Sequence, residues 1–238
     1  MSSIYRYNYI PFVAIIAALL LCIPLLGFNQ QTVKPKIVLS VAAQPVVDPI
    51  DEALKAGGLI DLKSLGANFD YDIRYATSNN FTGAPIYQSS RAYLRPQTAQ
   101  KLTDANKEFN ALGYKIKIYD AFRSLSVQKY LYFKVSAKAR AQHFIADPYT
   151  FGSNHNRGAA VDITIEHLDG TPVAMPTDFD SFLASAAIYY DNLPASVIKS
   201  RELLAAVMVK HGFTRCSIEW WHFDDTDAPG YSLIDIAF

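Results

Sequence analysis

The sequence predicts an α+β fold, with a mainly antiparallel sheet and helices packed on one side of it. Segments with helical periodicity and segments with strand-like alternation follow one another without a regular βαβ repeat, and no internal repeat or low-complexity tract occurs. Half of the 238 residues are hydrophobic, 13% are aromatic and only 18% are charged. Such a composition is typical of a folded chain with a sizeable core rather than a disordered one.

The first half of the folded part contains two expected helices and one strand. Residues 51–56 form a short helix that stops at a Gly-Gly pair. Residues 94–112 have helical periodicity, with Pro96 in the first turn and Gly113 just after the last. Residues 114–120 alternate between apolar and polar side chains, as a half-buried strand does.

The second half contains two further helices and two strands. Residues 126–144 return to a helical pattern. In residues 161–166, Val and Ile alternate with Asp, Thr and Glu, which predicts a strand with one polar face, and an Asp-Gly turn follows at 169–170. Residues 201–211 form an amphipathic helix, and residues 218–223 are aromatic and strand-prone.

The N-terminal region has the composition of a targeting segment. Residues 9–28 carry no charge and are mostly Ile, Leu, Ala, Val and Phe, a length of about 20 residues that can cross a bilayer as a helix. Arg6 supplies a weakly positive start. We expect residues 1–28 to be a signal peptide or membrane anchor, with the anchor favoured, residues 29–50 a linker, and residues 51–238 a single domain. The protein is then exported, to the periplasm or the extracytoplasmic face of the inner membrane.

Charge and cysteine content exclude two classes of protein. The chain has 22 Lys and Arg against 22 Asp and Glu, a formal net charge of zero. A nucleic-acid binder that neutralises phosphates is usually basic, so we expect no nucleic-acid partner, and membrane contact only through the N-terminal segment. Of the two cysteines, Cys22 lies in the apolar segment and leaves Cys216 alone, which excludes a disulfide framework.

A first polar run supplies two candidate metal ligands. In residues 153–162 (SNHNRGAAVD), His155 leaves a polar loop and Asp162 lies on the polar face of the expected strand. Gly158 and the two alanines after it allow close backbone approach. His nitrogen and Asp oxygen are both good zinc donors, at about 2.0–2.2 Å. The run therefore predicts two donors that converge on one metal ion.

A second run, residues 219–222 (EWWH), supplies a third candidate ligand and a base. His222 would complete three protein ligands and leave a fourth position open for water, as in catalytic zinc sites. Glu219 would take the proton of that water. In an undistorted strand Glu219 and His222 point to opposite faces, so the chain must bend or end there. Taken alone, this run also fits a Trp-rich core strand.

Together, S-x-H-x-x-G-x-A-x-D followed by E-x-W-H resembles the zinc D-alanyl-D-alanine dipeptidases of the VanX type. These are relatives of the D,D-carboxypeptidases and of the hedgehog signalling domain. The resemblance extends from about Asp70 to the C-terminus. Residues 73–77 (IRYAT) and 80–83 (NFTG) match the N-terminal signature of the family, and residues 120–123 (DAFR) resemble its D-G-Y-R-P segment.

The resemblance implies a hedgehog/D,D-peptidase-like fold and one Zn²⁺ ion with His155, Asp162 and His222 as its ligands. It implies Glu219 as the catalytic base. It implies Arg123 as the cation that polarises the scissile carbonyl and stabilises the tetrahedral oxyanion, a role that suits the permanently charged guanidinium.

The family pattern also places Tyr75, Ser153 and Asp180 near the free ammonium of the substrate. A carboxylate there is reasonable, because a dipeptidase must find a charged amine one residue from the bond that it cuts. Asp180 also fits an N-cap before residues 181–183, which remains as the alternative.

The sequence departs from the family pattern in the loop that carries the catalytic arginine. Ser124 replaces a Pro, and Phe122 replaces a Tyr. The loop is then expected to be less rigid, and one phenolic hydroxyl is missing. Two other polar stretches are expected to be unrelated to the site: residues 166–167 as the surface end of a strand, and residues 224–227 as a solvated turn.

The resemblance therefore predicts a zinc hydrolase of the small D,D-dipeptide D-alanyl-D-alanine. Two alternatives keep the same fold. The first is a D,D-carboxypeptidase that acts on longer peptidoglycan peptides. The second is a non-catalytic, zinc-stabilised binding domain like the hedgehog domain, which the presence of both Glu219 and Arg123 disfavours.

Overall fold

The computed structural model describes residues 48–238, so the predicted targeting segment and nearly all of the predicted linker lie outside the described residues. The helices are α1 (Pro49–Ala56), α2 (Pro96–Ala111), α3 (Leu125–Lys134), α4 (Ala137–Ala141) and α5 (Ala195–Lys210). The strands are β1 (Ile60–Asp61), β2 (Asp70–Tyr71), β3 (Tyr93–Leu94), β4 (Tyr114–Asp120), β5 (Ala160–His167), β6 (Phe213–Arg215) and β7 (His222–Asp225). Within residues 48–238, no helix has the length and apolar character needed to cross a bilayer.

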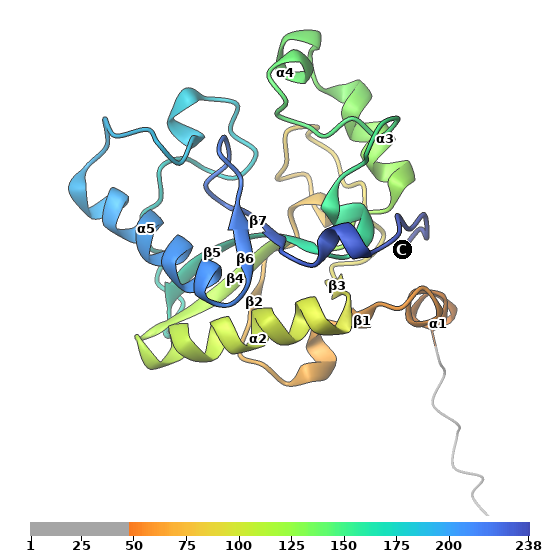
Figure 1. Cartoon of the computed structure of the whole chain (residues 1–238), viewed down its shortest axis with the longest axis horizontal. Coiled ribbons are helices and arrows are strands. Elements are labelled where there is room, and N and C mark those ends of the chain that lie inside the picture. The colour runs from red at the N-terminus through yellow and green to blue at the C-terminus, as the bar shows by residue number, and fades with distance from the viewer. Residues whose placement is uncertain (1–47) are drawn as a thin grey trace, which may run out of the picture. The chain divides into compact units, whose positions relative to one another are not determined.

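The central sheet has five strands in the order β2-β4-β5-β7-β6 (Figure 1). Only β2 and β4 pair in parallel; the other neighbours are antiparallel. Helix α2 packs against β4, helix α5 against β6, and the two helices against each other (Figure 1). The predicted class, a mainly antiparallel sheet with helices packed on it, is confirmed. Strands β1 and β3 form a separate antiparallel pair.

Side-chain alternation along the two longest strands divides the sheet into an apolar and a polar face. Ile116 and Ile118 of β4 and Ile163 and Ile165 of β5 are buried in the hydrophobic core, which also contains Phe109 of α2. Because successive strand residues point to opposite faces, the intervening side chains of both strands lie on the other face. In β5 these are Asp162, Thr164 and Glu166, and all three are buried.

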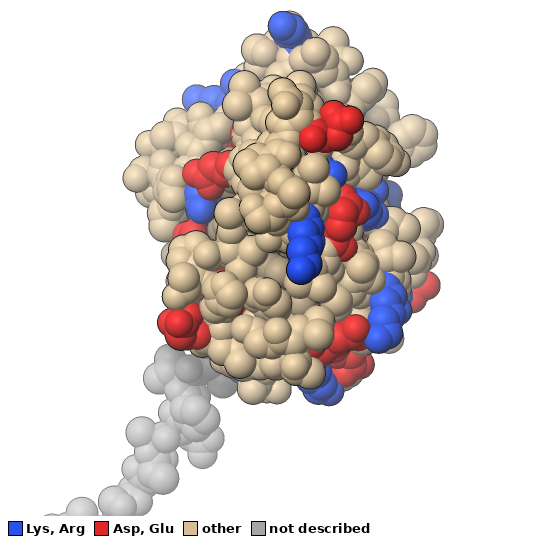
Figure 2. All heavy atoms as spheres, turned by 90° about the vertical axis from the view of Figure 1, so that its left-hand side faces the viewer, with Lys and Arg blue, Asp and Glu red and all other residues tan. Residues whose placement is uncertain are grey.

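The polar face is therefore covered rather than exposed, which corrects one expectation. Glu166, expected at the surface, is only 1% exposed. Its carboxylate forms ion pairs with Lys117 and, at 3.0 Å, with Lys115, which lies directly opposite it on β4. Cross-strand pairing compensates the buried charge. On the side of the molecule that Figure 2 shows, acidic and basic side chains are interspersed on the surface.

Two predicted helices differ from the observed ones. The single helix expected over 126–144 is divided into α3 and α4, because Val135 is extended and the Ser136 side chain accepts a hydrogen bond from the Ala139 N–H, which starts a new helix. Helix α5 begins directly after Pro194, six residues earlier than expected. Strand β4 has the predicted bounds.

Gly158 lies between a candidate metal ligand and β5, at a point where the backbone needs a left-handed conformation. It ends the 3₁₀ turn Asn154–Arg157 with φ 68° and ψ 29°. A Cβ atom built on it would lie 2.3 Å from Leu59 Cδ2 and 3.4 Å from the Arg95 nitrogen. Leu59 is only 1% exposed and cannot move aside freely. The left-handed backbone and the close approach of the Leu59 side chain therefore both require glycine at position 158.

Replacing Gly158 with Ala is expected to destabilise the protein by about 2–5 kcal/mol, the sum of about 1–2 for the left-handed backbone and about 1–3 for the clash with Leu59. Gly66→Ala is a matched control, because Gly66 has a similar φ of 62° and open space around it. The Gly66→Ala variant should be destabilised only by the left-handed backbone, by about 1–2 kcal/mol. Urea unfolding of both variants measures the difference, and equal losses would contradict this account of Gly158.

Candidate metal centre and catalytic cleft

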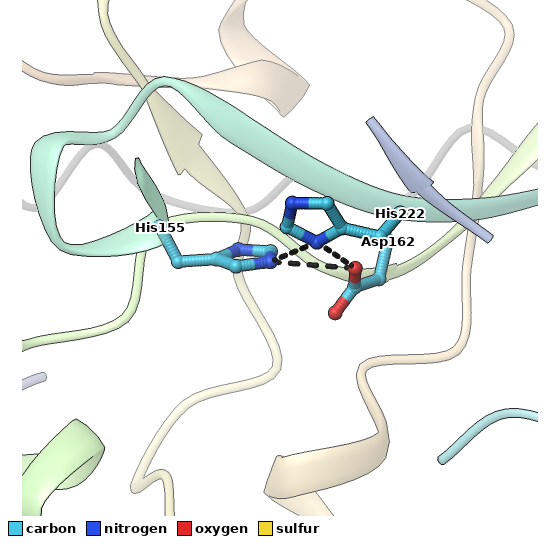
Figure 3. A group of neighbouring side chains, drawn as sticks. All are labelled: His155, Asp162 and His222. Atoms are coloured by element: carbon cyan, nitrogen blue, oxygen red, sulfur yellow. Dashed lines mark hydrogen bonds and ion pairs between the residues drawn. The ribbon is translucent and has the colours of Figure 1, made fainter. Parts of the chain in front are cut away.

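The three predicted metal ligands converge in the structure (Figure 3). His155 lies in the 3₁₀ turn Asn154–Arg157, while Asp162 of β5 and His222 of β7 are directly paired across the sheet. His155 Nε2 lies 3.2 Å from His222 Nδ1 and 3.3 Å from Asp162 Oδ1. His222 Nδ1 lies 2.9 Å from Asp162 Oδ1. Residues as far as 67 positions apart in the sequence thus bring one donor atom each to a common point.

Each imidazole is oriented by a partner on its far side. His155 Nδ1–H donates to the Ala121 carbonyl at 2.6 Å, and His222 Nε2–H donates to the Asp224 carboxylate at 3.0 Å. Such outer partners fix the tautomer of a ligating histidine. In the neutral rings, the facing nitrogens then have lone pairs and no proton to share. Two lone pairs and a carboxylate oxygen at about 3 Å are stabilised either by a proton on one imidazole or by a cation between them.

The electrostatics of the cluster favour positive charge at the same point. Burial opposes ionisation of His222, but Asp224 and Asp162 outweigh it and raise the pKa of His222 well above its usual value. Burial also opposes the charge of Asp162, yet the two imidazoles hold the pKa of its carboxyl below its usual range. These two carboxylates stabilise either a proton on His222 or a metal ion in its place.

The donor set fits zinc. Among residues 48–238, this group of two imidazole nitrogens and one carboxylate oxygen has all its donor atoms within 4.8 Å of one another. Zinc prefers such nitrogen and oxygen ligands, and bonds of about 2.0–2.2 Å in a tetrahedron place neighbouring donors about 3.4 Å apart. The observed separations are close to that value. His155, Asp162 and His222 are thus suitable ligands without rearrangement of the backbone.

The chain bends before β7, which resolves the problem of side-chain direction at Glu219. Residues 217–221 form bends and turns, and β7 starts only at His222. Trp220 and Trp221 are buried, and the Trp220 indole N–H donates to Thr177 Oγ1 at 2.9 Å. Glu219 consequently lines the same cleft as His222. Burial raises the pKa of the Glu219 carboxyl to about 7, with His222 opposing the shift and Asp162 adding to it.

Arg123 is buried beside the metal-ligand cluster. Its Nη2 lies 3.6 Å from Asp162 Oδ2. Two residues that sequence analysis did not single out hold the guanidinium: Asp120 Oδ2 accepts from Nε at 2.9 Å and from Nη2 at 2.6 Å, and Gln128 Oε1 accepts from Nη1 at 2.9 Å. The Arg123 side chain also lies over the Tyr75 ring, 5.1 Å from its centroid.

The two departures from the family pattern do not loosen the arginine loop. Ser124 caps α3, its Oγ accepting from the Val127 N–H at 3.3 Å. The Asn156 side chain donates to the Arg123 carbonyl at 2.8 Å. Phe122 is stacked on Phe238, with ring centroids 5.5 Å apart. The loop expected to be less rigid is therefore buried and bonded on both sides.

Tyr75 and Asp180, predicted to bind the substrate ammonium, lie together in the cleft. The Tyr75 hydroxyl donates to Asp180 Oδ1 at 3.2 Å, whereas Asp180 Oδ2 is buried without a partner. Burial and the nearby Asp162 raise the pKa of Asp180 well above its usual value. An N-cap at Asp180 is wrong, because the next helical turn starts only at Ala184 and Asp180 has a φ of 58°. A carboxylate left unpaired in this way is suited to a cationic ligand.

Ser153, the third residue expected near the ammonium, also lines the cleft. Its hydroxyl accepts from the His155 N–H at 3.2 Å, and its own N–H donates to Asn156 Oδ1 at 2.8 Å. This capping box starts the 3₁₀ turn Asn154–Arg157. Ser153 therefore fixes the turn that carries a candidate metal ligand, in addition to facing the cleft.

The expectation that residues 224–227 form a solvated turn is wrong at two positions. Asp224 orients His222, as described above. Asp225 is only 2% exposed and accepts from Thr98 Oγ1 and Lys101 Nζ, both at 2.5 Å, which ties α2 to β7. A signal for Asp224 exists in the sequence, since residues two apart on a strand share a face.

These groups share one cleft of about 410 Å³: three candidate metal ligands, a carboxyl with a pKa near neutrality, a buried arginine and an unpartnered carboxylate. This set defines the class of metal-dependent peptidases with a water nucleophile. The family described as D-ala-D-ala dipeptidase (peptidase M15) matches residues 55–236, and the chain belongs to this family. The predicted family and the predicted enzyme class are confirmed.

Individual relatives are similar over most of their length. The chain is 31% identical over 180 residues to a D-alanyl-D-alanine dipeptidase of Escherichia coli (strain K12), covering 76% of this chain and 91% of the relative. It is 27% identical over 192 residues to a D-alanyl-D-alanine dipeptidase of Enterococcus faecalis, and this match covers 72% of this chain and 93% of the relative. One similar solved structure is that of the vancomycin resistance D,D-dipeptidase VanXYg in complex with a D-Ala-D-Ala phosphinate analog. The match covers 71% of this chain and 66% of the VanXYg chain, with 18% sequence identity and a TM-score of 0.38.

Replacing His155 or His222 with Ala is expected to lower the zinc content of the purified protein, from about one ion per chain to about a tenth of that or less, because two ligands do not hold the ion. Metal analysis by mass spectrometry measures the loss. His211→Ala is the matched control, because His211 binds Glu108 at 2.8 Å and does not line the cleft. Full zinc content in both ligand variants would refute the assigned site.

Proposed function

We propose that this protein is a zinc-dependent dipeptidase that hydrolyses D-alanyl-D-alanine, with one Zn²⁺ ion bound by His155, Asp162 and His222. The observation that carries the proposal is the convergence of these three donors in one cleft with Glu219 and with the unpartnered carboxylate of Asp180. When bound, zinc supplies a Lewis acid that lowers the pKa of a water molecule and polarises the substrate carbonyl.

Glu219 acts as general base and then as general acid. It takes a proton from the attacking water, whose oxygen forms a bond to the carbonyl carbon. It then gives that proton to the nitrogen of the breaking peptide bond, and two molecules of D-alanine leave. A carboxyl with a pKa of about 7 can both accept and return a proton near neutral pH.

Arg123 stabilises the negative charge that develops on the carbonyl oxygen. Its guanidinium stays charged at any working pH, and Asp120 and Gln128 hold it in one orientation. Donors that are already oriented need no reorganisation during the reaction, which makes such stabilisation effective.

Asp180 and Tyr75 recognise the substrate ammonium. A buried carboxylate with one free oxygen is costly by itself, and a bound ammonium offsets that cost with a charge-assisted hydrogen bond. This arrangement favours a free dipeptide over a longer D,D-peptide, whose corresponding nitrogen is an uncharged amide. A D,D-carboxypeptidase that acts on longer peptides would have no cationic substrate group to pair with the buried, unpartnered oxygen of Asp180.

We also propose that residues 1–28 export or anchor the protein, that residues 29–50 are a linker, and that residues 51–238 act outside the cytoplasm. The support is the charge-free apolar run of residues 9–28, together with a substrate class that derives from peptidoglycan.

Replacing Glu219 with Ala or Gln is expected to lower kcat on D-alanyl-D-alanine by about 10³-fold or more, while zinc stays bound, because the base is lost and the ligands remain. Steady-state assays of D-alanine release, with metal analysis of the same samples, measure both effects. Glu202→Gln, which changes a carboxylate bound to Arg201 and Arg215, serves as the control. A Glu219 variant with near wild-type kcat would refute the assigned base.

The wild-type enzyme is expected to hydrolyse free D-alanyl-D-alanine at least about 100-fold more efficiently than the N-acetylated dipeptide, because acylation removes the charge that Asp180 binds. Comparing kcat/KM for the two substrates, with and without a chelator, tests this preference. Equal rates would favour the D,D-carboxypeptidase. No chelator-sensitive hydrolysis of either compound would favour the non-catalytic binding domain.

A further inference from the structure

We propose that Tyr87 is a positioning residue for Arg123, and that it acts by fixing the carboxylate of Asp120, which holds the guanidinium. Tyr87 itself does not line the cleft. The inference rests on the proposed function, in which Arg123 stabilises the oxyanion, and deepens it by naming the side chain that keeps this arginine in place.

The Asp120 carboxylate is fully buried and accepts four hydrogen bonds, two on each oxygen. Both bonds to Oδ2 come from the guanidinium of Arg123. Oδ1 accepts from the Tyr87 hydroxyl at 2.8 Å and from the Ala121 N–H at 2.9 Å. Within residues 48–238, Tyr87 is therefore the one side chain that donates to Oδ1. Its hydroxyl helps to fix the rotation of the carboxylate, which leaves Oδ2 for the guanidinium.

Arg123 lies between two carboxylates that are paired across the sheet. Asp120 ends β4, and its partner on β5 is Asp162, a candidate metal ligand. Arg123 Nη2 lies 2.6 Å from Asp120 Oδ2 and 3.6 Å from Asp162 Oδ2. A guanidinium binds the carboxylate whose oxygens match its fork of donors. The orientation of Asp120 thus decides whether Arg123 keeps the position proposed for oxyanion binding or shifts toward the metal ligand.

Tyr87 is held by ring packing and by its own backbone. Its ring centroid lies 5.7 Å from that of Tyr75 and 5.0 Å from that of Phe238. Its N–H donates to the Tyr75 carbonyl at 2.9 Å. Burial raises the pKa of the Tyr87 hydroxyl well above its usual value, so the hydroxyl keeps its proton. A donor that is fixed in this way can set the geometry of the groups that it touches.

The competing explanation is that the Tyr87 hydroxyl contributes only to stability, as a buried hydrogen bond. The chain offers a matched tyrosine for that role. Tyr93 is buried as well, its hydroxyl donates to the Asp51 carboxylate at 2.5 Å, and its ring also packs on Phe238, with centroids 5.5 Å apart. Neither Tyr93 nor Asp51 lines the cleft. Tyr93→Phe therefore shows the effect of losing a buried tyrosine hydroxyl without a link to Arg123.

The first test removes only the hydroxyl, as Tyr87→Phe in the full-length zinc enzyme. The kcat on D-alanyl-D-alanine, per zinc-bound chain, should fall by about 10- to 100-fold, while KM changes by less than about threefold, because the arginine acts mainly in the transition state. The affinity for a phosphinate analogue of the dipeptide, whose tetrahedral centre carries the charge that Arg123 binds, should fall by a similar factor. Tyr93→Phe should change all three quantities by less than about twofold.

The second test shows whether the effect passes through the arginine. In Arg123→Lys, the side chain keeps its charge but loses the fork that forms two bonds to Asp120 Oδ2. In that background, Tyr87→Phe should lower kcat by less than about twofold, because the geometry that the hydroxyl maintains is already lost.

Several outcomes would overturn the inference. An unchanged kcat in Tyr87→Phe, or a rise in KM alone, shows that the hydroxyl does not act on the transition state. Equal losses in the Tyr87 and Tyr93 variants show a structural role only. A full loss of kcat on adding Tyr87→Phe to Arg123→Lys shows an effect that bypasses the arginine. Failure of the wild type to hydrolyse D-alanyl-D-alanine is a different result, because it contradicts the proposed function itself and the inference with it.

Discussion

The architecture of this protein depends on the pairing of Asp162 with His222 across two antiparallel strands. This register places an imidazole nitrogen 2.9 Å from a carboxylate oxygen, and the 3₁₀ turn after Ser153 adds the nitrogen of His155. Without a metal ion or a proton on His222, three electron-rich atoms would face one another at this point. A slip of one residue between β5 and β7 would turn one ligand to the opposite face of the sheet. Correct strand pairing and metal binding are therefore the same structural requirement.

Much of the surrounding structure keeps buried charges in compensated pairs. Arg123 is bound to Asp120, Glu166 to two lysines, and Asp225 to Lys101 and Thr98. Each pair has little net value for stability when compared with an apolar replacement, but removal of one partner leaves a costly unpaired charge. The cleft differs, because Asp180 Oδ2 is buried there without a partner. A protein that compensates its buried charges elsewhere leaves one carboxyl group unpaired where the substrate ammonium is proposed to bind.

The sequence alone predicted the fold class, the bounds of β4 and the convergence of His155, Asp162 and His222. Alternating side chains predicted the strands, and the short spacing of His155 and Asp162 predicted that these two converge. The convergence of His222 with them was implied by the resemblance to the VanX-type dipeptidases. Asp120, Gln128 and Asp224 were not predicted as partners of the site, since their roles depend on side-chain packing between distant segments. Glu166 looked like a surface residue for the same reason: only the register with β4 shows that Lys115 and Lys117 face it. The break between α3 and α4 depends on one serine that competes as a cap, a weak signal within a helical pattern.

The left-handed backbone at Asp180 has a consequence for how this enzyme can evolve. At a φ of 58°, most side chains are strained, and apart from glycine the residues that tolerate this conformation best are Asp and Asn. Asn differs from Asp by one base in the codon and fits the same space without a charge. A single genetic step could thus remove the carboxylate that is proposed to bind the free amine, with little cost to folding.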